Sequence, residues 1–269
     1  MPAALAPQLA DLAARLWQAR RDGTVVEPDS VAAPTCAEDA YAVQARITEL
    51  SGGVTGAFKV GSTSAEAQRL LGTTEPGSCP VSSAYCFDSP ARIAISPAHM
   101  PAVEGEFAFR LGAALPAREA SYGAEEVAAA VDAVGGAIEV VGTRIAGGLA
   151  GKERFLVTAD SGANIALVTG NLTADWQTYD LPRHRVGMSI NGRTAGEGAG
   201  GRALGDPMNV LVWLANRQSE TGAGLPAGMI VSTGPCTALD PVKPGDSVVA
   251  DFGALGRVEI AFTEIGGAA

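Results

Sequence analysis

The stretch PAVEGEFAFRLG, residues 101–112, has the two-residue periodicity of a β-strand. Val103 and Phe107 fall on one face of this strand, and Glu104 and Glu106 fall on the other. Two residues on the same face of a strand lie about 7 Å apart, so the pattern places two carboxylates side by side. A solvated edge strand explains this arrangement, and so does a cation held between the two side chains.

More strand patterns follow along the chain, separated by two predicted helices. The strand patterns are AIEVVGTRI, ANIALVTG, VGMSING, DSVVADFG and RVEIAFTE, and the two helices cover residues 123–134 and 205–220. The first quarter of the chain is predicted to be helical, because leucines 5, 9, 12 and 16 follow helical spacing. The order predicts an α+β fold with a mixed or mainly antiparallel sheet. We expect a helical N-terminal part at residues 1–75 and a β-rich catalytic part at residues 76–269.

The composition is that of a globular protein and not of a disordered one. Of 269 residues, 47% are hydrophobic and 18% charged, and the net charge of −10 argues against a nucleic-acid partner or an anionic membrane surface. The first 23 residues have no basic region before their apolar positions, so we expect an amphipathic helix and not a signal peptide. No apolar run reaches membrane-spanning length, and the four cysteines form no CxxC pair, which predicts free thiols in the cytoplasm.

A third glutamate favours a bound cation over a solvated edge strand. Glu139 lies within GGAIEVVGTRI, which is apolar on both faces as expected of a covered strand. An ionised carboxylate there is costly unless a cation or several hydrogen bonds compensate it. Three glutamates on two strands suit a hard divalent cation such as Mg²⁺ or Mn²⁺. The alternative is a hydrogen-bonded structural Glu139 beside an unrelated exposed pair.

Lys59 is the candidate catalytic cation. It lies in GAFKVGSTS, at the end of a predicted strand and just before a helix. A lysine at such a junction often extends to solvent, which is the simple interpretation. The functional interpretation is an ammonium that faces the metal site and holds a carboxylate or moves a proton. The glycine-rich stretch at residues 196–205 is predicted to be a flexible loop, because no βαβ unit surrounds it.

Several motifs together resemble a known family over residues 9–263. They are FKVGSTS, LGTTEP, VEGEFAFRLG, AIEVVGTRI, GDPMNVLVWLAN and PVKPGDSVVADFGALGRVEIAF. The chain resembles the 2-keto-4-pentenoate hydratase and 4-oxalocrotonate decarboxylase group of the fumarylacetoacetate hydrolase superfamily. The resemblance implies a mixed β-sheet rolled around the active site, with a helical N-terminal part packed outside.

The resemblance also implies roles for individual residues. Glu104, Glu106 and Glu139 would bind Mg²⁺ or Mn²⁺, which would chelate a small 2-oxo acid, and Lys59 would be the catalytic lysine. The implied substrate-binding residues are Asp160, Arg144, Ser161, Thr233 and Thr237.

The implied reaction is the hydration of a 2-hydroxy-2,4-dienoate to a 4-hydroxy-2-oxo acid, as in the catabolism of aromatic compounds. The alternatives are a 4-oxalocrotonate-type decarboxylase, a C–C hydrolase, a keto–enol tautomerase, or a non-catalytic partner subunit. The hydrolases of this superfamily are thought to use a His–Glu pair, and neither His99 nor His184 lies near the required segment. We expect a homo-oligomer, with association with a related decarboxylase or hydratase subunit as a further option.

Two departures from the family pattern concern the hydration step. The family usually has an aspartate directly after the proline of LGTTEP, where this chain has Gly77. Ala163 and Asn164 replace two family serines after Asp160. The missing aspartate implies a substitute acid such as Asp88, a different substrate, or a different reaction.

Overall fold

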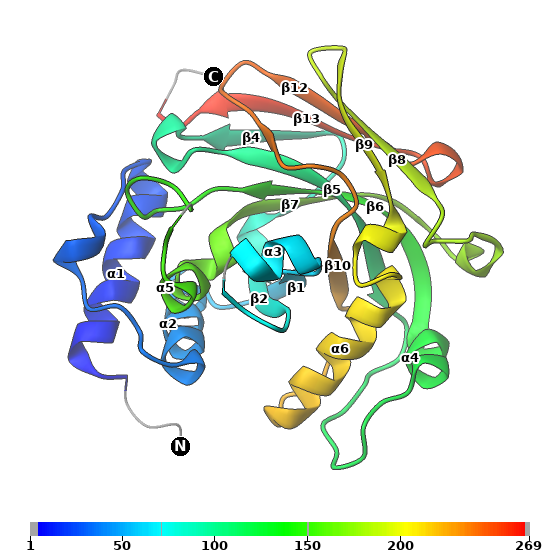
Figure 1. Ribbon diagram of the computed structural model, residues 1–269, viewed down its shortest axis with the longest axis horizontal. Coiled ribbons are helices and arrows are strands. Elements are labelled where there is room, and N and C mark those ends of the chain that lie inside the picture. Colours follow the sequence, from blue (N-terminus) through cyan, green and yellow to red (C-terminus); the bar gives the residue numbers. More distant parts are fainter. Residues whose placement is uncertain (1–4, 71, 150, 267–269) are drawn as a thin grey trace.

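The computed structural model describes residues 5–70, 72–149 and 151–266 as two curled β-sheets with helices along one side (Figure 1). The larger sheet has eight strands, in the order β2-β1-β10-β5-β6-β7-β3, with β11 also paired to β5. The strands are β1 (Thr55–Gly61), β2 (Gly77–Ser82), β3 (Cys86–Asp88), β5 (Ala102–Leu111), β6 (Val131–Val141), β7 (Asn164–Thr173), β10 (Ile230–Pro235) and β11 (Asp240–Pro241).

The smaller sheet has five strands in the order β4-β13-β12-β8-β9. They are β4 (Ala91–Ile95), β8 (Arg185–Ile190), β9 (Arg193–Ala199), β12 (Ser247–Asp251) and β13 (Arg257–Glu264). Phe107 on β5, Val186 on β8 and Phe262 on β13 belong to one buried apolar cluster, so the two sheets share a core. Burial of this apolar face is the main driving force for packing one sheet on the other.

The described residues form six α-helices, which lie along one side of the curled sheets (Figure 1). They are α1 (Pro7–Asp22), α2 (Ala37–Leu50), α3 (Ala65–Leu70), α4 (Ala124–Ala130), α5 (Arg154–Ala159) and α6 (Pro207–Glu220). Helices α1, α2 and α5 form a second core through side chains that include Leu12, Val43 and Leu156. This second core fixes α2 and α5 beside the ends of β1 and β2, where the candidate site lies.

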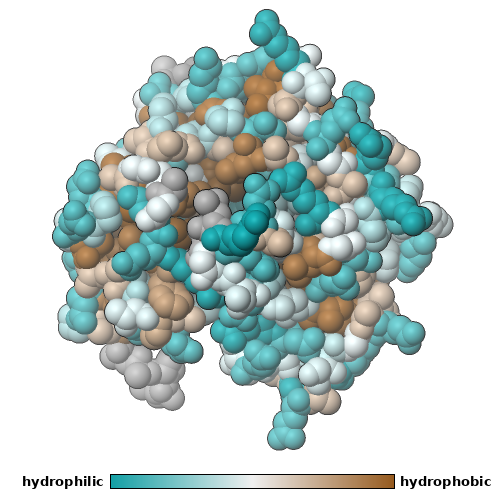
Figure 2. Space-filling model, viewed as in Figure 1, coloured by the Kyte–Doolittle hydropathy of each residue, from teal (hydrophilic) through white to brown (hydrophobic). Residues whose placement is uncertain are grey.

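The face of the molecule seen in Figure 1 carries both hydrophobic and hydrophilic patches. Hydrophobic side chains gather just above its centre, and strongly hydrophilic side chains lie next to them and along the edge (Figure 2). Among the helices that the structure describes, none combines the length and hydrophobicity needed to span a bilayer.

The predicted α+β class and the strand at residues 101–112 are confirmed. Strand β5 runs antiparallel to β6, and Glu104 lies directly opposite Glu139. The four cysteines are free, as predicted. The division at residue 75 stays a prediction: β1 lies before it and pairs with β10, which lies after it.

Two local predictions were wrong. The helix expected over residues 123–134 ends at Ala130, and Val131 begins β6, because β-branched residues here pair with β5 and tertiary pairing outweighs local helical pattern. The loop expected at residues 196–205 is in part strand β9, which pairs with β8. Its glycine content reflects close packing: a Cβ at Gly198 would lie 1.7 Å from the Cys236 carbonyl oxygen.

Candidate metal centre and active site

Three glutamates converge where β5 and β6 run side by side. Glu104 and Glu106 project from the same face of β5, and Glu139 projects from β6 opposite Glu104. One carboxylate oxygen from each lies within 4.8 Å of the other two. Glu106 and Glu139 are completely buried, while Glu104 is half-buried and lines a cavity. The cluster is therefore an internal arrangement and not a solvated edge of the sheet.

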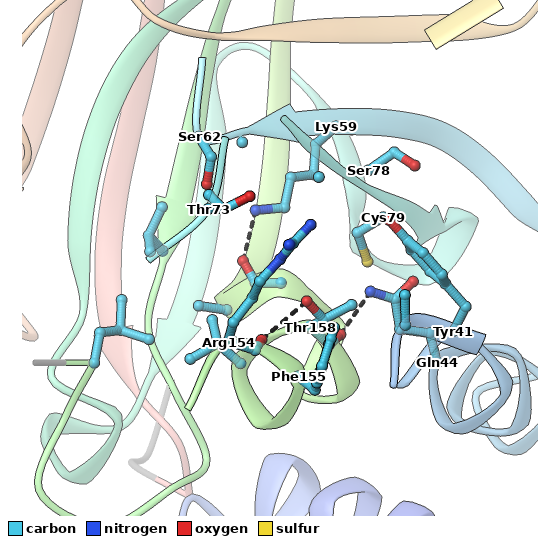
Figure 3. Close-up of a pocket in the computed structure, with 18 of the residues that line it drawn as sticks. Tyr41, Gln44, Lys59, Ser62, Thr73, Ser78, Cys79, Arg154, Phe155 and Thr158 are labelled. Carbon is cyan, nitrogen blue, oxygen red and sulfur yellow. Dashed lines mark hydrogen bonds between the residues drawn. The ribbon is translucent and has the colours of Figure 1, made fainter. Parts of the chain in front are cut away.

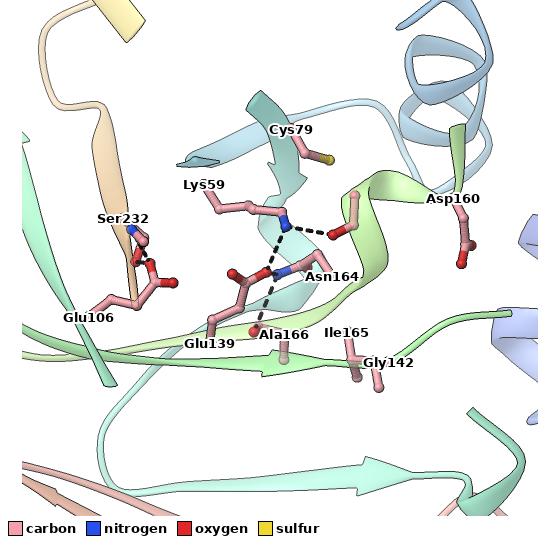
Figure 4. A network of polar contacts seen from close by, with 12 residues as sticks. Lys59, Cys79, Glu106, Glu139, Gly142, Asp160, Asn164, Ile165, Ala166 and Ser232 are labelled. Carbon is pink, nitrogen blue, oxygen red and sulfur yellow. Dashed lines mark hydrogen bonds and ion pairs between the residues drawn. The ribbon is translucent and has the colours of Figure 1, made fainter. Parts of the chain in front are cut away.

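Residues on the neighbouring strands satisfy only part of the hydrogen-bonding capacity of these carboxylates. The Ser232 hydroxyl and the Gly234 amide donate to Glu106 Oε2 at 2.5 and 2.9 Å, and Asn164 Nδ2 donates to Glu139 Oε1 at 2.8 Å (Figure 4). Glu106 Oε1 and Glu139 Oε2 are buried and have no hydrogen-bond partner among the described residues. Unpartnered buried carboxylate oxygens are costly, and a cation between them would remove that cost.

The pKa values of two glutamates in the cluster fit a site that binds a cation. Burial, together with the negative charge of Glu139, raises the pKa of Glu104 to about 7. The same two causes raise the pKa of Glu106 well above its usual range. Glu104 and Glu106 can both be ionised at neutral pH only if positive charge compensates them. The residues present therefore fit a hard divalent cation with oxygen ligands.

Lys59 lies beside this cluster and does not extend to solvent. It is 6% exposed, and its Nζ lies 3.4 Å from Glu139 Oε1 and donates to the Gly162 carbonyl at 2.5 Å (Figure 4). Burial on its own lowers the pKa of Lys59, but the attraction of Glu139, Cys79 and the other glutamates outweighs it and raises the pKa. Lys59 is therefore held as an ammonium at the edge of the cluster.

Gly162 shapes the environment of this lysine. Its φ of 57° is left-handed, a conformation that favours glycine. A Cβ at this position would lie 3.0 Å from Lys59 Cε and 3.1 Å from Nζ. A glycine here therefore lets the ammonium reach the backbone carbonyl without a steric conflict.

A cavity of about 190 Å³ opens next to Lys59 and Glu104. Its walls come from β1, β2, α2 and α5, and Figure 3 shows the lysine entering it from β1. The polar side chains that line it include Tyr41, Gln44, Ser62, Thr73, Glu75, Ser78, Cys79, Arg154 and Thr158. Leu149, Phe155 and Leu239 supply apolar surface. A small organic acid fits this mixture of an acidic cluster, a cation and apolar walls.

Arg144 and Asp160 are predicted to bind substrate, but their side chains bind each other and nearby backbone groups. The Arg144 Nε donates to Asp160 Oδ1 at 2.7 Å, and its other nitrogens donate to backbone carbonyls of residues 142, 160 and 164. Both side chains are 1–2% exposed and neither lines the cavity described above. Their role as substrate ligands stays a prediction. The geometry assigns them a structural task, since the loop at residues 142–144 is bound to the end of α5.

The remaining predicted substrate ligands also make internal contacts. The Thr233 hydroxyl donates to the Phe107 carbonyl, and the Thr237 hydroxyl accepts from the Gly105 amide. Ser161 has a left-handed backbone, with φ of 54°, next to Gly162. None of these three is among the residues that line the cavity. Their binding roles likewise stay predictions.

Candidate acids and bases differ in their access to the cavity. Asp88, expected as a substitute acid, lies on β3 at a different cavity, so the geometry does not support that role. His99 binds the Thr24 carbonyl and His184 the Phe252 carbonyl, and neither lines the cavity beside Lys59. Sequence reasoning missed Glu75 and Arg154, which do line it. Glu75 lies in the LGTTEP motif, but no motif contains Arg154, and only the fold brings residue 154 beside residue 75.

Comparison with known proteins gives the chain full-length relatives. No protein-family model matches it. It is 33% identical over 265 residues to the 2-keto-4-pentenoate hydratase of Paraburkholderia xenovorans (strain LB400), covering 96% of both chains. It is 34% identical over 167 residues to a 4-oxalocrotonate decarboxylase of Pseudomonas putida, covering 60% of both chains.

A solved structure supports the same relationship. The 4-oxalocrotonate decarboxylase of Pseudomonas putida G7, complexed with magnesium and adipate, superposes with a TM-score of 0.83 at 26% identity. The match covers 95% of this chain and 97% of the decarboxylase. The expected family and fold are thereby confirmed.

Replacement of Glu106 tests the cation site. Glu106→Gln keeps the shape of the side chain and can still accept from Ser232 and Gly234, but it removes one anionic ligand. We expect Mn²⁺ affinity, measured by calorimetry or electron paramagnetic resonance, to fall about 100-fold or more. The metal-free variant should unfold at an equal or higher urea concentration, because a buried repulsion is gone. Wild-type Mn²⁺ affinity in the variant would contradict the three-glutamate assignment.

The pH dependence of metal binding provides a second test. The pKa of Glu104 is about 7 without metal, so below pH 7 a proton must leave this carboxylate when the cation binds. We expect the apparent Mn²⁺ affinity to fall about tenfold per pH unit for each proton released as pH decreases from 7 to 5.5. The measurement is a series of Mn²⁺ titrations at constant ionic strength. An affinity independent of pH over this range would show that the carboxylates are not the ligands.

Proposed function

The chain belongs to the family of 2-keto-4-pentenoate hydratases and 4-oxalocrotonate decarboxylases, and from that premise we propose that it hydrates a 2-hydroxy-2,4-dienoate to a 4-hydroxy-2-oxo acid with Mg²⁺ or Mn²⁺ as cofactor. The observation that carries the proposal is the convergence of three carboxylates, two of them with unpartnered oxygens, beside a buried lysine at a cavity wall. The names of the relatives support hydration ahead of decarboxylation, because the hydratase match covers nearly the whole chain.

In the proposed mechanism, the residues at the closed end of the cavity bind and orient the cation. Glu104, Glu106 and Glu139 would hold the cation, and Ser232 and Asn164 keep two of these carboxylates oriented. The bound cation would supply Lewis-acid stabilisation of the negative charge that develops on the 2-oxygen of the substrate. The carboxylate and 2-oxygen of the substrate would therefore lie next to Glu104, which lines the cavity.

Lys59 would donate a proton to the substrate at this end of the cavity. Its Nζ is fixed between Glu139 and the Gly162 carbonyl, and one face of the side chain lines the cavity. A positioned ammonium can donate a proton to C5 of the dienoate and stabilise the anion that forms when water adds at C4. The overall reaction adds H and OH of one water molecule to C5 and C4, and the enol at C2 becomes the 2-oxo group as its proton is replaced by one at C3. The apolar walls near Phe155 and Leu239 would limit the access of other water molecules.

Decarboxylation is the second candidate. The structural similarity to the Pseudomonas putida G7 decarboxylase supports it, with a TM-score of 0.83. Both reactions need the same stabilised negative charge on the 2-oxygen, and they differ in what happens at the far end of the substrate. Assembly as a homo-oligomer, association with a related subunit and a cytoplasmic location are also part of the proposal; the free cysteines support a reducing compartment.

The reaction and the role of Lys59 are tested together by proton NMR in D₂O with 2-hydroxypenta-2,4-dienoate, with and without Mg²⁺. We expect Mg²⁺-dependent formation of 4-hydroxy-2-oxopentanoate. Lys59→Met should lower turnover about 10²- to 10⁴-fold. Its Mn²⁺ affinity should be unchanged or higher, because Lys59 competes with the cation for Glu139. Wild-type turnover in this variant would show that Lys59 has no catalytic role, and loss of CO₂ from 4-oxalocrotonate without hydration would favour the decarboxylase.

Gly77 allows a gain-of-function test. It lines the cavity, its φ is not left-handed, and a Cβ built on it meets no atom within 4 Å. Gly77→Asp should therefore fold normally and restore the acidic group that the family resemblance implies. If that group assists hydration, turnover of 2-hydroxypenta-2,4-dienoate should rise about tenfold or more. Gly77→Asn is the matched control, since it adds the same bulk without a titratable group; an equal gain in both variants would exclude a proton-transfer explanation.

A further inference from the structure

Arg154 is a cation at the cavity wall whose hydrogen-bonding capacity is largely unused. It is the first residue of α5, its side chain is 31% exposed, and Figure 3 shows the guanidinium pointing into the cavity on the side of Lys59. Within the described part of the chain its only side-chain hydrogen bond is a long one, 3.4 Å from NH2 to Glu75 Oε1. A guanidinium has five N–H donors, so most of them remain available to a ligand.

The position of Arg154 distinguishes it from the cation site. Glu75, its partner, is 61% exposed, whereas the side chain of Glu139 is 1% exposed. Arg154 therefore lies at the solvent end of the cavity, and the glutamate cluster lies at the buried end. Gly77 also lines this cavity and contributes no side chain, so it leaves space in the cavity and adds no negative charge to its wall.

From this geometry we propose that Arg154 binds a second carboxylate at the far end of the substrate, which makes the preferred substrate a 2-oxo or 2-hydroxydienoic dicarboxylic acid. This inference rests on the proposed function, which places the first carboxylate and the 2-oxygen beside the glutamates. A planar guanidinium matches a carboxylate in a bidentate pair, and such charge-assisted hydrogen bonds are among the stronger ones. In the free protein, Glu75 occupies one of these donor positions through its weak 3.4 Å contact.

The pairing also bears on which reaction occurs. A carboxylate held by Arg154 is stabilised as an anion, which opposes its loss as CO₂. Hydration leaves both carboxylates intact, since it only adds H and OH across the double bond. The arrangement therefore favours hydration of a dicarboxylic substrate over decarboxylation at its far end.

Two acids of equal chain length test the inference. 2-Oxoadipate and 2-oxohexanoate differ only in the second carboxylate, and their binding to the Mg²⁺-loaded protein can be measured by titration calorimetry. We expect the wild type to bind 2-oxoadipate about 10- to 100-fold more tightly. Arg154→Met should remove this difference and change the affinity for 2-oxohexanoate by less than about twofold. Glu75→Gln, which frees the guanidinium, should raise the affinity for 2-oxoadipate about two- to fivefold.

Arg183→Met is the matched control. Arg183 forms the same kind of 3.4 Å ion pair, with Asp180, but its side chain is 89% exposed and does not line the cavity. Its replacement removes the same charge and should leave the affinities for 2-oxoadipate and 2-oxohexanoate unchanged. If Arg183→Met loses as much 2-oxoadipate affinity as Arg154→Met, the loss comes from the change in net charge and not from a contact with Arg154, which would overturn the inference.

The other outcomes are equally decisive. Equal binding of the two acids by the wild type, or a parallel loss of both in Arg154→Met, would overturn the role of Arg154 and leave the proposed function standing. If Arg154→Met does not fold, a decrease in 2-oxoadipate affinity in Glu75→Gln overturns it and an increase supports it. If the wild type binds neither acid with Mg²⁺, the proposed function fails and this inference fails with it.

Discussion

The mutual repulsion of three neighbouring carboxylates is the constraint on which the rest of the site depends. One carboxylate oxygen each of Glu104, Glu106 and Glu139 lies within 4.8 Å of the other two, and Glu106 and Glu139 are completely buried. Water does not reach these two side chains to screen them, and one lysine cannot neutralise three negative charges. The raised pKa values of Glu104 and Glu106 express the same imbalance in the metal-free protein. A divalent cation would resolve the imbalance, and the paired strands hold the carboxylates in the positions that it requires.

The order of strands in the larger sheet explains how this arrangement is built. Strand β5 lies at the centre, with β10 and then β1 on one side and β6 and then β7 on the other. The neighbouring strands supply Lys59 from β1, Ser232 and Gly234 from β10, Glu139 from β6 and Asn164 from β7. A site built on paired strands is held rigidly, because the backbone ladders determine where each side chain starts. Helices α2 and α5 then close the cavity from the outside.

The two ends of the cavity differ in the side chains that they contribute. The buried end, with its glutamates and Lys59, suits any 2-oxo acid and fits the shared chemistry of the family. At the solvent end, Arg154 contributes a guanidinium whose only side-chain hydrogen bond within the described residues is the long contact with Glu75. In the proposed function, differences at this end would change the substrate and the fate of its far carbons, while the stabilisation of the 2-oxygen would stay the same. Function within a fold is decided at such positions.

The sequence by itself determined the class of the fold and the chemical character of its centre. The alternation in residues 101–112 and the apolar setting of Glu139 placed three glutamates on two strands, since period-two patterns report directly which face a side chain occupies. Local pattern could not determine where the helix before β6 ends, because pairing of Val131 with β5 outweighs the helical tendency of the preceding alanines. Only the tertiary structure decided which polar residues meet: it paired Arg144 with Asp160 and brought Arg154 to Glu75, 79 positions away. Such contacts depend on the packing of distant elements, and neither periodicity nor spacing along the chain encodes them.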